Sequence, residues 1–358
     1  MRIHSTSVVA TALLLLGVAA CQDLTALKQV NPGQVSAATL YVPANAQLLV
    51  NGAISDFECA YTRYVVGSGL FTDELSNAIG STANYDYDAR RLTTNGSYGT
   101  GQCGSNQQPP IYTTLSTARG SADTVLARLK EWTDAQMPIN INRTKLIGQA
   151  ATYAGLSLVL MGEGMCSSAI NLSAELTPAQ VFAEAKSRFD AGIEAATAAS
   201  DAATLNLALL GRARVLLDLG NAASAGVDAA KIPAGFLAAT GTDNVSVRRQ
   251  NYTFVSINTN SFNTVDASFR GLTVNGLPDP RVAVTNTGRA GTALGSIVWT
   301  ADKYSLITTV TPIARYAEAQ LIVAEAKAVA GDLPGAAAAI NIVRASRTGV
   351  PAYDATGQ

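Results

Sequence analysis

Apolar residues recur every three or four positions over most of the chain, which is the spacing of an amphipathic helix. The first such segment starts near residue 44 and ends near a Gly-Ser-Gly at 67–69, and its repeating side chains are Leu48, Leu49, Gly52, Ala53, Phe57, Ala60 and Tyr64. Further helices are predicted over 111–135, 143–161, 178–196, 205–219, 222–230, 313–330 and 334–347. The chain is therefore predicted to be mostly α-helical.

Three pairs of these helices have the size and the small-residue turns of tetratricopeptide-type hairpins. The pairs are 143–161 with 178–196, 205–219 with 222–230, and 313–330 with 334–347. Thr177 is the expected N-cap of its helix, and Pro178 suits the first helical position. Gly331 is expected to end a helix in the left-handed conformation, and Pro334 to begin the next. Because the period is irregular, the pattern predicts an irregular array of hairpins.

The stretch 233–311 has a different pattern, because apolar and polar residues alternate in segments such as VSVRRQNYTFVSIN and LTVNGLPDPRVAVTNTG. Such alternation, with β-branched residues and an Asn-Gly pair, is typical of short strands and hairpins. The predicted fold class is mostly α, with irregular tetratricopeptide-like helical hairpins and a small β-containing insertion. We expect one domain over 44–358, helical over 44–232 and 312–358, with the insertion over 233–311.

The N-terminus has the layout of a secretory signal peptide over 1–20, with Arg2, an apolar run and then small residues. The run is too short to span a bilayer as a mature helix. The motif VAAC at 18–21 resembles the bacterial lipobox, and by that resemblance Cys21 carries the lipid. The alternative is an ordinary thiol after a plain signal peptide. The polar segment 21–43 is predicted to be a lipidated tether, and Gln22 after the cysteine favours the outer membrane over the inner one.

Composition excludes several classes of function. The chain has 25 basic and 26 acidic residues, so no sequence-wide positive charge favours nucleic acid as a partner. Its one histidine, His4, lies in the predicted signal peptide. A mature chain without histidine has no Ser-His-Asp triad, Cys-His pair or imidazole base. Nucleotide-binding glycine motifs are missing too. We therefore predict no catalytic residue, no metal site and no cofactor.

The remaining cysteines are Cys59, Cys103 and Cys166, and an exported protein meets oxidising conditions. A disulfide between Cys59 and Cys103 would hold a long loop against the first helix, and Cys166 is an equally suitable partner. An odd count leaves one thiol over. The pairing stays open at this stage.

Three motifs follow one another in the last part of the chain: LPDPRV at 277–282, KYSLITTVTPIARYAEAQLIVAEA at 303–326 and GDLPGAAAAINIVRASRTG at 331–349. In this order, and after a lipobox, they resemble the SusD/RagB family of outer-membrane nutrient-binding lipoproteins. Members commonly continue beyond this last hairpin, so the chain is expected to be a short member or to lack its C-terminus. Glu318 and Glu325 share one helix face, and we expect them to meet Arg315 or Lys303 as part of the scaffold.

The resemblance implies a lipid-anchored, surface-exposed protein of the outer membrane. Such proteins lie over SusC-like TonB-dependent transporters and capture a glycan, a peptide or another oligomeric nutrient without breaking bonds. Ligand contacts in the family come from loops and aromatic side chains outside the hairpins. The corresponding segment here is the Tyr-rich loop 72–110, whose candidate ligand-binding residues are Asp73, Glu74, Tyr85, Asp86, Tyr87, Arg91 and Tyr98. Tyrosine rings stack on sugars, and Asp and Arg bind hydroxyls.

The same features allow other interpretations. The loop residues can simply pack on the helices. Trp132 and Trp299 are better explained as core or transporter-facing residues than as sugar platforms. Asp86 with Asp88 is a weak calcium-binding pattern. At the level of function, one alternative is a tetratricopeptide-like scaffold lipoprotein that binds only proteins. A carboxylate-dependent glycosidase is the remaining alternative and would need two carboxyl groups in one cleft.

Overall fold

The computed structural model describes residues 35–80, 86–91, 103–104, 111–293 and 295–354. Contacts between residues divide the chain into two units, Met1–Val42 and Pro43–Gln358. The described part of the first unit contains helix α2 (Ala37–Leu40), whose N-cap Ser36 accepts a hydrogen bond from the Thr39 amide. The other named helices and strands lie in the second unit.

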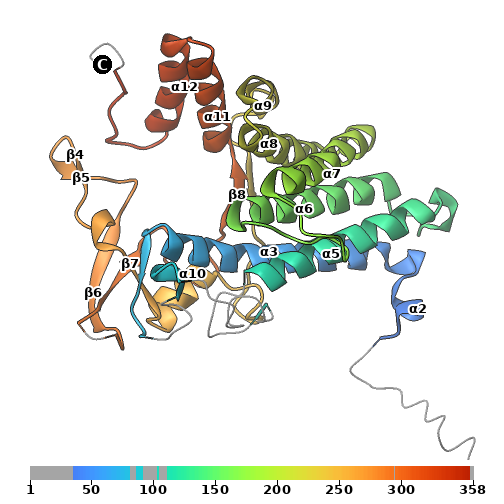
Figure 1. Ribbon diagram of the computed structural model, residues 1–358, viewed down its shortest axis with the longest axis horizontal. Helices are drawn as coiled ribbons and strands as arrows, with labels where there is room; N and C mark the ends of the chain where they lie inside the picture. The colour runs from blue at the N-terminus through green and yellow to red at the C-terminus, as the bar shows by residue number, and fades with distance from the viewer. Residues whose placement is uncertain (1–34, 81–85, 92–102, 105–110, 294, 355–358) are drawn as a thin grey trace, which may run out of the picture. The chain divides into compact units, whose positions relative to one another are not determined.

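The second unit is an array of helices that follow one another in space much as they do in sequence (Figure 1). The long helices are α3 (Ala46–Phe71), α5 (Tyr112–Glu131), α6 (Arg143–Gly164), α7 (Pro178–Ala198), α8 (Ala202–Asp218), α9 (Ala222–Ala229), α11 (Tyr316–Val329) and α12 (Leu333–Ala345). Short 3₁₀ turns are η1 (Pro43–Asn45), η2 (Asp134–Gln136) and η4 (Ala267–Phe269). The predicted mostly α fold is confirmed.

Helices pair into the three predicted hairpins, α6 with α7, α8 with α9, and α11 with α12, and α11 also packs on α9. Capping side chains determine where α7 and α12 begin. Thr177 and Gln180 form a capping box ahead of α7, with Pro178 in its first turn. In the turn that joins α11 to α12, Gly331 has φ +81°. The Asp332 side chain then accepts a hydrogen bond from the Gly335 amide and caps the start of α12.

Close approach of α6, α7 and α8 depends on two glycines. The Phe189 ring of α7 is fully buried and lies where the Cβ of any larger residue at Gly155 or Gly211 would fall. A Cβ at Gly211 would stand 2.4 Å from the ring, so the ring fills the space left by the missing side chains. The core continues from here to Phe57 of α3 and to Ile313 before α11.

The β-containing insertion contributes at least one strand to each of four short antiparallel pairs in the described residues. They join β1 (Leu75–Asn77) to β3 (Asn263–Val265), β2 (Leu237–Ala239) to β8 (Pro312–Arg315), β4 (Thr273–Val274) to β5 (Leu277–Pro278), and β6 (Val284–Ala290) to β7 (Ile297–Ala301). The β4–β5 hairpin turns at Asn275 and Gly276, both with positive φ, which is the geometry that an Asn-Gly pair predicts. The predicted small β-containing insertion is confirmed.

Two details of the predicted elements are wrong. The segment VSVRRQNYTFVSIN, expected to be strand-like, contains the helical turns α10 (Tyr252–Phe254) and η3 (Val255–Thr259). The Asn251 side chain caps them by accepting from the Phe254 amide, a local interaction that outweighs the β-branched composition. Ile313, expected in a helix, lies in strand β8, because pairing with β2 holds this segment extended as far as Arg315.

None of the helices in the described ranges has the length and apolar character needed to cross a bilayer.

Candidate functional site

The start of the Tyr-rich loop lies at the C-terminal end of α3, beside the insertion. The Glu74 amide donates to the Gly69 carbonyl at 2.9 Å, and the Asp266 amide donates to the Glu74 carbonyl at 3.1 Å. Between them, Asp73 takes a positive φ of 59°. The start of the loop is thereby fixed to both α3 and β3 by backbone hydrogen bonds.

A polar and aromatic surface forms around Asp73. Its carboxylate pairs with the Arg90 guanidinium, and both side chains are about half exposed, 56% and 47%. Arg90 also stands over the Phe71 ring, with its guanidinium carbon 5.7 Å from the ring centroid, and Phe71 is 42% exposed. Sequence reasoning selected Arg91 and missed Arg90, because the pairing with Asp73 joins positions 17 residues apart.

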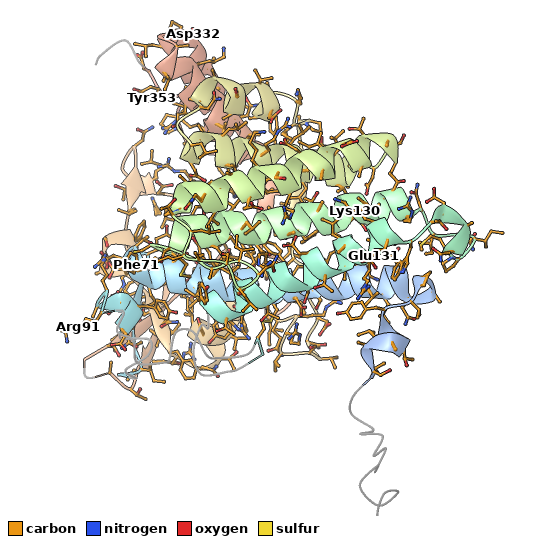
Figure 2. The ribbon with its side chains drawn as sticks, turned by 45° about the vertical axis from the view of Figure 1, so that its right-hand side comes forward. Phe71, Arg91, Lys130, Glu131, Asp332 and Tyr353 are labelled. Atoms are coloured by element: carbon orange, nitrogen blue, oxygen red, sulfur yellow. A yellow bond between two sulfur atoms is a disulfide. The ribbon has the colours of Figure 1, made fainter. Side chains whose placement is uncertain are left out.

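Asp86, Tyr87 and Arg91 belong to one turn that is closed by a 2.8 Å hydrogen bond from the Arg91 amide to the Asp86 carbonyl. Arg91 is exposed and Asp86 partly so, and Figure 2 shows Arg91 at the same end of the molecule as Phe71. Tyr87 is only 5% exposed and packs into the core. Its ring therefore offers no free face for stacking. Tyr85, Tyr98 and Cys21 lie outside the described residues.

Carboxylates next to this surface have shifted pKa values. Burial raises the pKa of Asp88, and the charges of Asp73 and Asp266 add to the rise. Burial acts in the same direction on Asp266, yet hydrogen bonds from Ser268 and Ser76 prevail and lower its pKa to about 2. Within the described ranges, no group of three His, Cys, Asp or Glu side chains is placed to hold a metal ion. The Asp86 and Asp88 pattern thus has no further ligand there.

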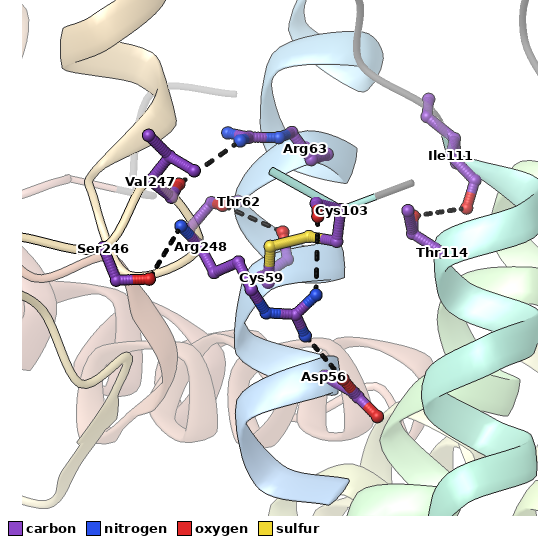
Figure 3. The surroundings of a disulfide bond; sticks show 10 residues. All are labelled: Asp56, Cys59, Thr62, Arg63, Cys103, Ile111, Thr114, Ser246, Val247 and Arg248. Atoms are coloured by element: carbon purple, nitrogen blue, oxygen red, sulfur yellow. Dashed lines mark hydrogen bonds and ion pairs between the residues drawn. A yellow bond between two sulfur atoms is a disulfide. The ribbon is translucent and has the colours of Figure 1, made fainter. Parts of the chain in front are cut away.

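A disulfide joins Cys59 in α3 to Cys103 in the loop, with 6.1 Å between their Cα atoms (Figure 3). Cys166 is an exposed free thiol. Of the pairings that the sequence left open, the structure thus selects the one that closes a loop of 44 residues. The bond fixes the far part of the loop to the middle of α3, where Cys59 is only 1% exposed.

Two arginines lie beside the disulfide. Arg248 donates to the Cys103 carbonyl at 3.4 Å and pairs with Asp56 of α3 (Figure 3). Arg63 is 1% exposed and stands over the Tyr252 ring at 3.4 Å. Burial lowers the pKa of Arg63 to about 10, so the guanidinium stays charged at neutral pH. Arg248 therefore connects the loop to α3, whereas Arg63 packs on Tyr252 beside the disulfide.

Glu318 of the RYAEA motif differs from expectation. It forms a double-contact ion pair with Arg214 of α8, not with Arg315 or Lys303. Arg214 also donates to the Ile313 carbonyl, and Tyr61 donates to the Pro312 carbonyl at 2.6 Å. The motif therefore ties the last hairpin to α8 and α3 and acts as scaffold.

Two hollows lie between the insertion and the last hairpin. One has a volume of about 810 Å³ and the other about 570 Å³. Both are lined by Lys303, Tyr304, Arg315, Ala317, Leu321, Val343 and Arg347. Among the loop candidates, Glu74 lines the larger hollow. Sequence reasoning missed this place, although its cations stand in or next to the motifs that carry the family resemblance.

The two tryptophans do not stand at these surfaces. Trp132 is the C-cap residue of α5 and is partly buried. Trp299 in β7 packs against the core, with the Arg270 guanidinium carbon 5.2 Å from its ring centroid.

Comparison with solved structures places the fold in a known class. A SusD-like carbohydrate-binding protein from Bacteroides vulgatus superposes with a TM-score of 0.63 and 16% identity, over 87% of this chain and 76% of that one. Surface glycan-binding protein A from Bacteroides fluxus gives 0.61 and 13%, over 88% and 84%. A SusD superfamily protein from Bacteroides thetaiotaomicron gives 0.59 and 12%, over 87% and 81%. At these identities the similarity establishes the fold.

The chain therefore has the SusD-like fold of tetratricopeptide-like helical hairpins. The sequence model of the SusD family matches residues 270–358, the part that holds the three motifs. Together these findings confirm the predicted resemblance to the SusD/RagB family, by sequence over 270–358 and by fold over most of the chain. The comparison with curated proteins gives no match.

Proposed function

We propose that this protein captures a glycan or another oligomeric nutrient at the outer membrane and hands it to a TonB-dependent transporter. The observation that carries the proposal is the shared fold, which extends over 87% of the chain in a comparison with a SusD-like carbohydrate-binding protein. The family match over 270–358 supports it independently, because it rests on sequence.

The anchor in this proposal is the lipidated Cys21, with 21–43 as the tether that separates the domain from the membrane. Three acyl chains at one N-terminus hold a protein firmly, since each buried methylene contributes about 0.8 kcal/mol. The domain of 44–358 then lies at the cell surface. A SusC-like transporter is the proposed partner because nutrient oligomers do not cross the outer membrane unaided.

The proposed ligand-binding surface is the end of α3 with the first part of the loop. Phe71 offers a half-exposed ring, and Asp73, Arg90 and Arg91 offer charged hydrogen-bonding groups next to it. Apolar ring faces with polar groups at their edges are what a sugar requires. Tyr85 and Tyr98 stay candidates for stacking, whereas the burial of Tyr87 argues against that role.

Binding without catalysis is part of the proposal, since a chain whose one histidine is His4 has no imidazole for acid–base work once the signal peptide is removed. The second candidate function is a scaffold that binds only proteins. It is favoured by the hairpin array itself, because tetratricopeptide-like hairpins in general form protein-binding surfaces.

A glycan array probed with the full chain in mild detergent tests the proposal, with chromatography of each bound glycan for products. We expect saturable binding of at least one oligosaccharide class and no product. Asp73→Asn with Arg90→Gln is expected to weaken this binding about tenfold, while Lys130→Gln on α5 leaves it unchanged. If no glycan binds and a peptide library is equally blank, nutrient capture is contradicted and the scaffold function is favoured.

A further inference from the structure

The two hollows share part of their lining, which includes Tyr304 and three cations, Lys303, Arg315 and Arg347. At about 810 Å³ and 570 Å³, each has the size of a small-ligand pocket. In Figure 1, strand β8 and helices α11 and α12 mark one side of this place, and Gly69 of α3 and Glu74 of the loop also line the larger hollow. The chain thus offers a concave surface that adjoins the proposed loop site.

The lining of the two hollows carries more positive than negative charge. In the part of the chain that the structure describes, the ion pairs of this region join Arg214 to Glu318 and Arg281 to Asp279. Neither pair includes Lys303, Arg315 or Arg347. The acidic residues lining the larger hollow are Glu74 and Asp302, and Asp302 already accepts from the Thr285 and Thr300 hydroxyls. Cations gathered around a concave surface raise the local concentration of anions.

The backbone dipoles of α11 also favour an anion at this place. Arg315 is the N-cap residue of α11, and Ala317 in its first turn lines both hollows. The N-terminus of a helix of 14 residues adds a partial positive charge next to the three cations. Glu318 in the same turn is already held by Arg214, so it does not neutralise Arg315.

The remaining lining suits a ligand with hydroxyl groups and an apolar face. Leu321 and Val343, one from each helix of the last hairpin, supply apolar surface, and Leu321 is 48% exposed. Burial raises the pKa of Tyr304, although the charge of Arg315 acts against it. The Tyr304 hydroxyl therefore keeps its proton and can donate a hydrogen bond.

We propose that the shared part of the two hollows, formed by Lys303, Tyr304, Arg315 and Arg347, binds the carboxylate of an acidic saccharide such as a uronate. The guanidinium groups pair with the carboxylate oxygens, and the sugar ring rests on Leu321 and Val343. This inference rests on the proposed function and narrows it, because it names the class of glycan that the protein captures.

Calorimetric titration of the full chain in mild detergent tests the site, with a short oligogalacturonide and its fully methyl-esterified form as probes. The two probes have the same chain of sugars and differ in the carboxylate charge. We expect the acid to bind at least about tenfold more tightly than the ester and to lose affinity as salt is added.

Variants assign that binding to the site. Arg315→Gln and Arg347→Gln, singly and together, are expected to lower the affinity for the acid about tenfold for each cation and to leave the ester unchanged. Lys130→Gln is the matched control, since it removes an exposed cation from α5, which Figure 2 shows apart from the last hairpin labelled at Asp332. An unchanged thermal midpoint confirms that each variant is folded.

Equal affinities for acid and ester would overturn the inference, and so would an acid affinity that the double variant leaves unchanged. Equally tight binding of a short polyglutamate would show that the hollow does not select saccharides, which also contradicts it. Binding of neutral glycans without any binding of the acid removes this inference and leaves the proposed function standing. If neither neutral nor acidic saccharides bind and a peptide library is equally blank, the proposed function fails as well.

Discussion

Glu163, near the end of α6, is a carboxyl group in an environment that opposes its charge. Burial raises its pKa to about 7, and the neighbouring Asp218 carboxylate adds to the rise, whereas Arg214 acts against it. The residue is nonetheless exposed to solvent, so water weakens the effect. A carboxyl group in this position makes the stability of the fold depend on pH.

The expected sign follows from the two pKa values. The unfolded chain loses the Glu163 proton near pH 4.5 and the folded protein near pH 7, so the free energy of unfolding falls as the pH rises through this window. Glu163→Gln removes the titration. We expect the variant to be more stable than the parent by about 1 kcal/mol at pH 8, a value reduced for solvent exposure, and equal to it at pH 4.

Urea denaturation at both pH values measures this difference. Glu194→Gln on α7 is the control, because that carboxyl group is exposed and forms no ion pair with the described residues. A Glu163→Gln variant that is no more stable than the parent at pH 8 would contradict the account of this residue.

At the scale of single residues, the sequence did not predict the contacts between residues that lie far apart in the chain. Asp73 was predicted as a candidate ligand-binding residue, and nothing local indicated that Arg90 would pair with its carboxylate. Tyr87 was selected for its type, and its burial depends on helices that the loop sequence does not contain. Residue type predicts chemistry, whereas tertiary contacts decide whether that chemistry faces solvent.

At the scale of elements, the ion pair between Glu318 and Arg214 links two hairpins. It joins α11 to α8, and Arg214 and Glu318 are 19% and 26% exposed. Glu318→Ala leaves the Arg214 guanidinium without its acidic partner, and we expect a loss of about 2 kcal/mol in the free energy of unfolding. The matched control is Glu325→Ala on the exposed side of the same helix, with an expected change below about 0.5 kcal/mol.

Chemical denaturation of the two variants measures the difference. Equal effects of the two substitutions would show that the pair between hairpins contributes nothing specific. Because Glu318 belongs to the RYAEA motif, the result also shows whether this motif contributes to the stability of the scaffold.

Helices and hairpins were predicted well because their signals are local. Spacing of three or four residues, a capping Thr177 and a Gly331 turn each act within a few residues. Strand β8 was missed because its partner β2 lies about 75 residues earlier in the chain, a separation that periodicity does not register. The hollows depend on segments from Val65 to Arg347, so no window of sequence reveals them.

At the scale of the whole molecule, the disulfide connects the loop to the helical array. Closing a loop of 44 residues is expected to stabilise the fold by about 3–4 kcal/mol, mainly by restricting the unfolded chain. Cys103→Ser should therefore lower the denaturation midpoint strongly. Cys166→Ser is the control, since this thiol is exposed and unpaired, and it should change the free energy of unfolding by less than about 0.5 kcal/mol.

Peptide mapping without reduction tests the bond directly, because the fragments with Cys59 and Cys103 should appear joined. Separate fragments, or a Cys103→Ser variant as stable as the parent, would contradict the pairing. Loss of glycan binding together with the bond would further indicate that the loop must be held against α3 to bind its ligand.

The function proposed for this protein is that of the capturing partner of a transporter. Gentle-detergent purification of the tagged full chain from the membranes of its own cells, followed by mass spectrometry, tests this function. We expect a TonB-dependent β-barrel to be recovered with the chain in near-equal amount. Recovery of the chain from those membranes without any such barrel, at detergent concentrations that preserve other outer-membrane complexes, would contradict it.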